Sequence, residues 1–376
     1  MYFKKFVAVA TVVAATSLPF AVHAQEVHTL TPHFPDAFKV RSTATSDAEM
    51  TMPNQTGGTD KKGTHSTVSW TADTKKTADG YHATVMIENM AVDTVPPMAA
   101  AAPATPAPAG TTAAATPPMD PAELAQKMTA LLKLIGNAEV SYDGNMRPLR
   151  VDNLDALKAN VKSMIMMGAS TQDAPKITSM FDLFTKDITP ESAASLLRQS
   201  TQSRLPYGKP LALNTPVALD PATSELYGAK LTIGGTATLT SWEEGKAAHM
   251  TVAIQAPEAE FRTFAITLAN NFMDKIMVAM GKQAKPEEMA QVKTMIARVV
   301  NGMSIQIGMS CKVDVDLTNT ALTHSDCTSD VLVKLDTSKM LTPEQLKASP
   351  DLATKMKVYT VTQTSHSVSD TVLATN

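Results

Sequence analysis

The 376-residue sequence is poor in cysteine, in aromatic side chains and in clustered positive charge. It contains 2 Cys, 10 Phe, 2 Trp and 6 Tyr, whereas 23 Met supply much of its large apolar volume. No segment carries the basic stripe that neutralises phosphates, and few rings are available to stack on bases. A nucleic acid is therefore not an expected partner.

Long apolar runs are missing beyond the N-terminus, so no transmembrane segment is expected in the mature chain. At the N-terminus, Lys4 and Lys5 precede an apolar stretch over 6–20, and small residues occupy the first and third positions before Gln25. This pattern is typical of a secretory signal peptide. We predict that residues 1–24 are removed by cleavage after Ala24 and that the product is periplasmic or secreted.

Motifs for catalysis and for metal binding are also missing. The sequence contains no G-x-S-x-G, H-E-x-x-H, P-loop or EF-hand pattern. The histidines of the mature chain lack ligand spacing; they are His28, His33, His65, His82, His249, His324 and His366. Asp314 and Asp316 alternate on one predicted strand, which indicates a solvated face. We expect no catalytic residue, no metal and no cofactor, and a protein that is not an enzyme; a hydrolase site assembled from distant segments is beyond what local sequence reveals.

The two cysteines, Cys311 and Cys327, flank a predicted hairpin that reverses at Asn319. That reversal places Val315 opposite Thr323, Val313 opposite Ser325 and Cys311 opposite Cys327. In an oxidising compartment such a cross-strand pair forms a disulfide, worth about 3 kcal/mol for a loop of this size. The spacing is not that of a redox-active C-x-x-C pair, and two thiols alone make a poor zinc site.

Composition divides the mature chain into three parts. Residues 25–95 are rich in Thr and Val and predict a β-rich segment, with a hairpin turn at Asp79 and Gly80. Residues 96–119 are almost entirely Ala, Pro, Thr and Met and predict a linker or an insertion. Residues 120–376 predict an α+β domain, which could share one sheet with 25–95.

In the third part, predicted strand pairs alternate with predicted helix pairs. Helices are expected at 120–135, 154–167, 176–185, from Thr189 onward, 258–280, 286–300 and from Thr342 onward, and strands at 138–142, up to 151, 229–242, 247–254, on both sides of Asn319, and 357–362. Hairpins joined by helices indicate the α+β class, with a curved antiparallel sheet packed against several α-helices.

The predicted helix ending at Met280 has an unusually wide apolar arc. One edge of that arc carries Phe272, Met273, Ile276, Met277 and Met280, and we identify these five residues as candidates for lining an apolar ligand site. Two interpretations stay open: neighbouring helices cover both apolar stripes, or the Met edge borders a cavity. Methionine clusters also suit Cu(I), but they fall among Leu and Ile at helical spacing without His, which favours core packing.

Three features resemble an uncharacterised family of secreted bacterial proteins: the turn at Asp143 and Gly144, the stretch 205–217 before a hairpin, and the reversal at 316–319. The chain is more distantly similar to open-barrel lipoprotein carriers, a resemblance that implies a curved sheet around helices and an apolar cavity. The leading hypothesis is a non-enzymatic periplasmic protein that binds an apolar small molecule or lipid. The alternative is an envelope structural or interaction protein with a filled core, whose partner is another envelope protein.

Overall fold

The computed structural model describes residues 26–53, 58–95, 136–167, 174–198, 202–279, 286–340 and 358–375. The predicted signal peptide, the segment 96–119, the predicted helices at 120–135 and from Thr342, and Met280 lie outside the described residues.

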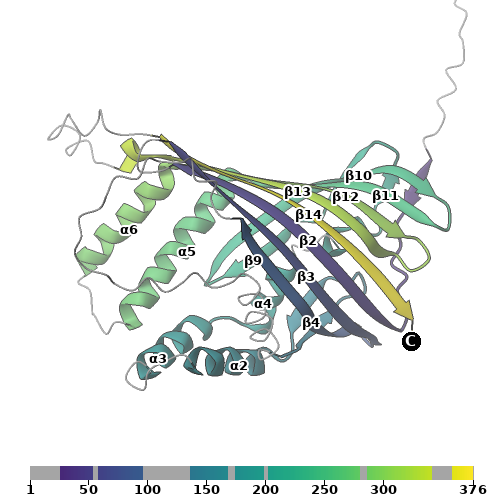
Figure 1. The fold of residues 1–376 in the computed structure, drawn as a ribbon, viewed down its shortest axis with the longest axis horizontal. Helices are drawn as coiled ribbons and strands as arrows, with labels where there is room; N and C mark the ends of the chain where they lie inside the picture. Colours follow the sequence, from purple (N-terminus) through teal and green to yellow (C-terminus); the bar gives the residue numbers. More distant parts are fainter. Residues whose placement is uncertain are drawn as a thin grey trace, which may run out of the picture.

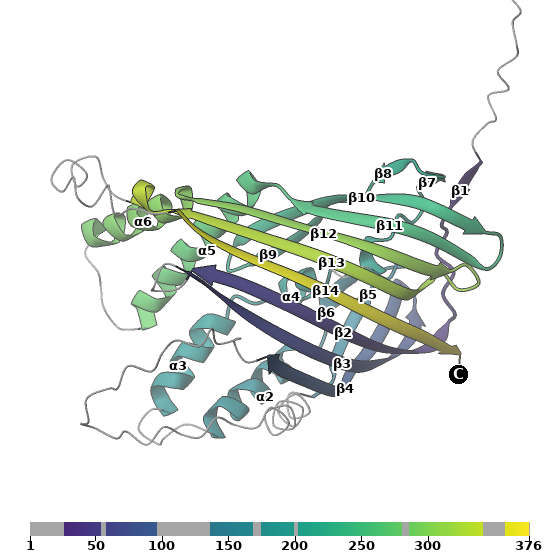
Figure 2. The ribbon, with the colours of Figure 1, turned by 45° about the horizontal axis from the view of Figure 1, so that its top comes forward.

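One large antiparallel sheet dominates the described chain, and it is curved and unclosed (Figure 1, Figure 2). Its order is β6 (Pro148–Val151), β5 (Ala138–Tyr142), β4 (Gly80–Val95), β3 (Thr59–Thr77), β2 (Ala37–Pro53), β14 (Val358–Thr375), β13 (Ala321–Asp336), β12 (Met303–Asp316), β11 (Ala247–Ala256), β10 (Ala229–Glu243) and β8 (Pro216–Ala218), and β9 (Ala222–Leu226) also pairs with β10. β1 (Val27–Thr29) and β7 (Pro210–Ala212) form a separate two-stranded sheet. Strands on both sides of residues 96–135 therefore belong to the same sheet.

The described helices lie on one side of this sheet, which we call its inner face (Figure 1). They are α2 (Leu154–Met167), α3 (Ala174–Thr185), α4 (Pro190–Leu197), α5 (Glu258–Ala279) and α6 (Pro286–Asn301), with short 3-10 helices η1 (Gln202–Arg204) and η2 (Thr337–Met340). The predicted combination of a curved antiparallel sheet and helices is confirmed, although strands outweigh helices.

Local sequence explains several element ends. Thr189 caps α4 by accepting a hydrogen bond from the Ser192 amide, Ser192 accepts one from the Thr189 amide in return, and Pro190 begins the helix. Gly80 begins β4 at the β3–β4 turn with φ +148°, and a Cβ there would lie 2.1 Å from the carbonyl oxygen of Tyr142. This turn therefore requires glycine at position 80.

The main hydrophobic core lies at one end of the inner face. It joins inward-facing residues of the sheet to the N-terminal segment and to the chain around η1; its largest fully buried members include Leu30, Phe38, Leu205, Leu211, Leu239, Met250, Val252, Val313 and Val315. A smaller cluster joins Val140 and Val151 to Ala194 of α4. Packing at the core end therefore anchors the sheet, the N-terminal segment and α4 to one another.

A buried polar network connects this core to the β12–β13 turn. The Tyr207 hydroxyl donates to the Thr320 carbonyl at 3.0 Å and accepts from the Gln202 side-chain amide at 2.6 Å. The Gln202 side-chain oxygen accepts from the Leu322 amide at 2.8 Å. Burial raises the pKa of Tyr207, so this phenol stays protonated and keeps its donor.

We expect Tyr207→Phe to lower the free energy of unfolding by about 1–3 kcal/mol, because buried groups of Thr320 and Gln202 lose their partner. Urea denaturation measures this change. Tyr359→Phe is the matched control, since Tyr359 is 40% exposed and should change stability by less than about 0.5 kcal/mol. Equal effects of the two substitutions would contradict the structural role of the network.

The β12–β13 hairpin differs from its predicted register near the turn. Val313 lies opposite Ser325 and Cys311 opposite Cys327, as predicted, but Val315 lies opposite Leu322 rather than Thr323. The register shifts between Asp314 and Val315, where the strand pair contains an irregularity. Counting residues outward from the turn could not reveal this shift.

The last strand is much longer than predicted: β14 spans Val358–Thr375, whereas the sequence indicated 357–362. Its inward positions from 363 to 371 are Gln, Ser and Thr, so the chain lacks the apolar alternation that marks a half-buried strand. Pairing with β13 on one side and β2 on the other satisfies its backbone and forms the strand.

Candidate functional site

Four central strands of the sheet carry all of their charged side chains on one face. The inner positions are the odd-numbered residues of 303–315 in β12, of 325–335 in β13 and of 359–373 in β14, and the even-numbered residues of 38–52 in β2. None of these residues is charged. The charged residues of these strands occupy the outer face, where they are exposed or half-buried. The inner positions of these four strands are therefore uncharged, and their outer positions carry the charged side chains.

Part of the inner face is apolar but only half-buried. We call this part the inner apolar surface; it comprises Met50, Val68, Trp70, Ile87, Met90, Ile307, Met309, Val331, Val333 and Val361. Among the described residues, the helices pack mainly on β6, β9, β10 and β12, and no helix packs comparably on β13, β14, β2 or β3. Large apolar side chains in the middle of the sheet therefore remain partly accessible.

A strip of small side chains runs between the larger ones of this surface. It is formed on adjacent strands by Ala44, Ser46, Ala48, Ser329, Ser365, Ser367 and Ser369. The Ser329 and Ser365 hydroxyl oxygens lie 2.7 Å apart, so these hydroxyls satisfy each other. The strip is therefore narrow, shallow and free of side-chain charge.

The predicted ligand-lining residues that the structure describes lie on α5. Phe272 is 41% exposed and stacks on Phe184 of α3, with ring centroids 5.0 Å apart. Met273, Ile276 and Met277 are half-buried, and Met280 lies outside the described residues. That these five residues line a ligand site stays a prediction.

Polar side chains of α5 make structural contacts with neighbouring elements. The Asn271 side chain donates to the Tyr227 carbonyl at 2.6 Å, and Asp274 pairs with Lys293 of α6 at 3.0 Å. Lys275 bonds Asp187, which lowers the pKa of that carboxyl, and its ammonium nitrogen lies 5.0 Å from the centre of the Tyr227 ring. α5 is therefore held on several sides by α3, α6 and the β9–β10 turn.

Cys311 and Cys327 form a disulfide on the inner face. Cys311 is fully buried and Cys327 is 7% exposed, and both belong to the main core. The pairing predicted from hairpin parity is confirmed. Because the bridge is surrounded by core residues, its position is that of a structural crosslink.

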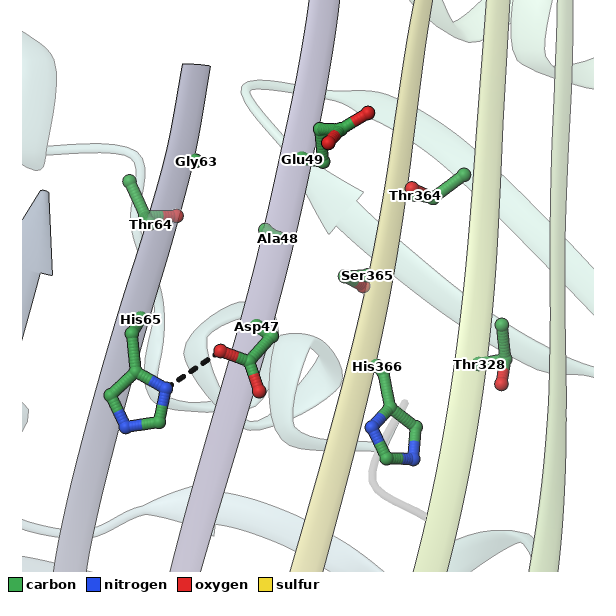
Figure 3. Close-up of a pocket in the computed structure, with 10 residues that line it drawn as sticks. All are labelled: Asp47, Ala48, Glu49, Gly63, Thr64, His65, Thr328, Thr364, Ser365 and His366. Carbon is green, nitrogen blue, oxygen red and sulfur yellow. Dashed lines mark hydrogen bonds and ion pairs between the residues drawn. The ribbon is translucent and has the colours of Figure 1, made fainter. Parts of the chain in front are cut away.

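The outer face carries two shallow hollows. One of about 410 Å³ lies across β3, β2, β14 and β13; Figure 3 shows Asp47 between His65 and His366 there, with Asp47 bonded to His65. Another of about 690 Å³ crosses β10 to β13 and is lined mainly by small residues, including Gly234, Ala253 and Gly308. Neither hollow is lined by α5.

Sequence reasoning treated these histidines as scattered residues, and the structure brings four of them together on the outer face. The His249–Asp314, His324–Asp370, His366–Asp326 and His65–Asp47 pairs each have a nitrogen–oxygen distance of 2.6 or 2.7 Å. Residue parity within each strand was visible in the sequence, but the pairing of strands was not. Nevertheless, no group of three or more His, Cys, Asp or Glu in the described ranges is arranged to hold a metal ion.

No helix in the part of the chain that the structure describes has the length and apolar character needed to cross a membrane. No protein-family model and no curated protein matches the chain, so the resemblance to a family of secreted bacterial proteins stays a prediction. Among solved structures, the chain is similar to one titled "Lipid-protein interactions in lipovitellin", with a TM-score of 0.37 and 8% identity. That match covers 89% of this chain and 25% of the other, so this chain spans about a quarter of its length.

Proposed function

We propose that this protein is a non-enzymatic, exported protein that binds an apolar, lipid-like ligand on the inner face of its sheet. The observation that carries the proposal is the inner apolar surface, where Trp70, Met90 and Met309 are among large apolar side chains left half-buried. Covering a partly exposed apolar surface is favourable by about 25 cal/mol per Å² of apolar area removed from water. An apolar ligand would provide that cover.

The small-residue strip supports an elongated ligand. Ala44, Ser46 and Ala48 follow one another on the inner face of β2, and larger side chains stand on both sides of the strip. An acyl chain is thin enough to lie along such a strip. The absence of charge at the inner positions of the central strands favours an uncharged ligand segment there.

The disulfide supports the exported part of the proposal. Disulfides such as Cys311–Cys327 form and persist in oxidising compartments, which include the bacterial periplasm. We therefore propose that the protein is periplasmic or secreted and that it meets its ligand in that compartment.

Native mass spectrometry of the full protein, purified from its own envelope without detergent, tests the proposal directly. We expect a stoichiometric apolar adduct, and denaturing extraction then identifies the released molecule. Nile red, an uncharged apolar dye, serves as the probe for titrations of ligand-free protein by fluorescence.

Substitutions on opposite faces of one strand locate the site. Val68 lies on the inner face opposite Ala44 and Met90, whereas its neighbour Thr67 lies on the outer face. We expect Val68→Asp to weaken Nile red binding at least about tenfold, because a carboxylate is costly in an apolar contact. Thr67→Asp is the control and should bind the dye as the unaltered protein does.

A second pair tests the shape of the site without charge. Ser46→Phe would fill the strip, and Thr45→Phe places the same ring on the outer face. We expect only Ser46→Phe to abolish the adduct, with both variants checked for folding by thermal denaturation. A protein that carries no adduct and binds Nile red equally in all variants would contradict the proposal and favour the envelope structural or interaction protein.

A further inference from the structure

Four histidines that are distant in sequence lie in two cross-strand rows on the outer face. The first row contains His249, Asp314, His324 and Asp370, on β11, β12, β13 and β14. The second row contains His366, Asp47, His65 and Asp93, on β14, β2, β3 and β4. Each row thus alternates His and Asp over four neighbouring strands.

Three neighbouring His–Asp pairs within these rows are in contact. His249 Nδ1 lies 2.6 Å from Asp314 Oδ1, and His324 Nδ1 lies 2.7 Å from Asp370 Oδ1. In the second row, His65 Nδ1 lies 2.7 Å from Asp47 Oδ1. Every one of these contacts joins two adjacent strands.

Asp326 links the two rows. It follows His324 by two residues on the outer face of β13, and its Oδ1 lies 2.7 Å from Nε2 of His366 on β14. Lys312 of β12 lies opposite Asp326 in the strand register. The two rows therefore lie side by side and hold four His–Asp pairs, each between adjacent strands.

Other charged side chains lie beside the rows, and the cations among those named below already have acidic partners. Glu243 of β10 lies 3.9 Å from His249, Lys61 pairs with Glu49, and Arg41 pairs with Glu88. Asp330 follows Thr328 on the outer face of β13 and lines the other hollow, which crosses β10 to β13. None of these groups supplies a second cation to the four paired aspartates, which are Asp47, Asp314, Asp326 and Asp370.

We propose that the two histidine–aspartate rows form a proton-linked switch of charge and stability on the outer face. With neutral imidazoles, Asp47, Asp314, Asp326 and Asp370 face one lysine, Lys312, and the surface is acidic. With protonated imidazoles, each of these carboxylates contacts a cation on a neighbouring strand. Opposite charges on facing strands stabilise a sheet, so protonation tightens the strands that also form the inner face.

The sign of the pH dependence follows from the geometry. The hydrogen bond with Asp370 raises the pKa of His324 above its usual 6.5, and the nearby Asp314 and Asp326 act in the same direction. A histidine with a raised pKa stabilises the folded state fully below about pH 6.5 and loses that contribution as pH rises through its folded pKa. The folded protein should therefore gain stability on going from pH 8 to pH 5.5.

Urea unfolding of the full protein at pH 8 and pH 5.5 tests the switch. We expect the folding equilibrium constant of the unaltered protein to rise about tenfold more between these pH values than that of a variant with glutamine at positions 65, 249, 324 and 366, because each of the four exposed pairs adds a small favourable factor when its imidazole is protonated. His33→Gln is the matched control, because His33 is exposed and lies outside the rows. Its pH dependence should equal that of the unaltered protein.

NMR titration of the folded, unaltered protein provides a test that does not depend on the folding of a variant. We expect His324 to titrate above its usual pKa of 6.5 because of its hydrogen bond with Asp370, and Asp370→Asn to return it toward that value. A His324 pKa at its usual value, or identical pH dependence of the quadruple variant and the unaltered protein, would overturn the proposal. Neither measurement involves a ligand, so the outcome is separate from that of the proposed function.

Discussion

Replacing Phe38 with alanine is expected to lower the free energy of unfolding by about 3–5 kcal/mol. Phe38 is 1% exposed at the core end of the inner face, and its ring centroid lies 6.1 Å from that of Phe34 and 6.0 Å from that of Tyr81. The substitution removes the apolar area of the ring and leaves a cavity between the sheet and the N-terminal segment. Urea denaturation measures the loss.

Two variants sharpen this measurement. Phe38→Leu keeps much of the apolar volume and should cost clearly less than Phe38→Ala. Lys39→Ala changes the next residue, which faces outward and pairs with Asp73 at 3.7 Å, and should cost less than about 1 kcal/mol. A loss below about 1 kcal/mol for Phe38→Ala would show that this end of the sheet is not the principal core.

Removing the disulfide is expected to cost about 3 kcal/mol, because Cys311 and Cys327 are separated by 16 residues and the open loop regains entropy in the unfolded chain. Denaturation of the unaltered protein with and without reductant measures this difference. Because both sulfurs are buried, we expect reduction to proceed slowly in the folded state and readily once the chain unfolds.

The neighbouring cross-strand pair provides the control for the bridge. Ser310 and Thr328 face each other one position away from the cysteines, on the outer face. Alanine at both positions should leave stability within about 0.5 kcal/mol of the unaltered protein. Equal denaturation curves with and without reductant would contradict a stabilising role for the disulfide.

Much of the local structure was predictable. Period-3.6 patterns with Pro or Thr at the start indicated α4, α5 and α6, and the reversal near Asn319 predicted the partner of Cys311 from parity alone. In the turn itself, Thr320 adopts φ +53°, an unusual conformation for a β-branched residue, and receives a hydrogen bond from the His33 amide at 2.7 Å. That contact spans 287 residues, so no local pattern could indicate it.

In the candidate sites, too, some features were predictable from local sequence and others depended on long-range packing. The sequence marked α5 as an apolar helix, but the contacts of Asn271, Lys275 and Phe272 with α3 and the β9–β10 turn depend on how distant elements pack. It also showed Ser and Thr alternating with His and Asp in 358–375, without the apolar signal of a strand. The neighbours of that segment make it a central strand of the sheet.

The sequence by itself determined the class of the fold, most helices and hairpins, and the disulfide, because these depend on residue period and short-range parity. Only the tertiary structure decided which strands are neighbours, for β2 meets β14 although more than 300 residues separate their paired positions. That pairing places Met50 beside Gln363 on the inner face and Asp47 beside His366 on the outer face. Both the inner apolar surface and the histidine–aspartate rows arise from such long-range register, since backbone hydrogen bonding sets side-chain neighbours across strands that the sequence never places together.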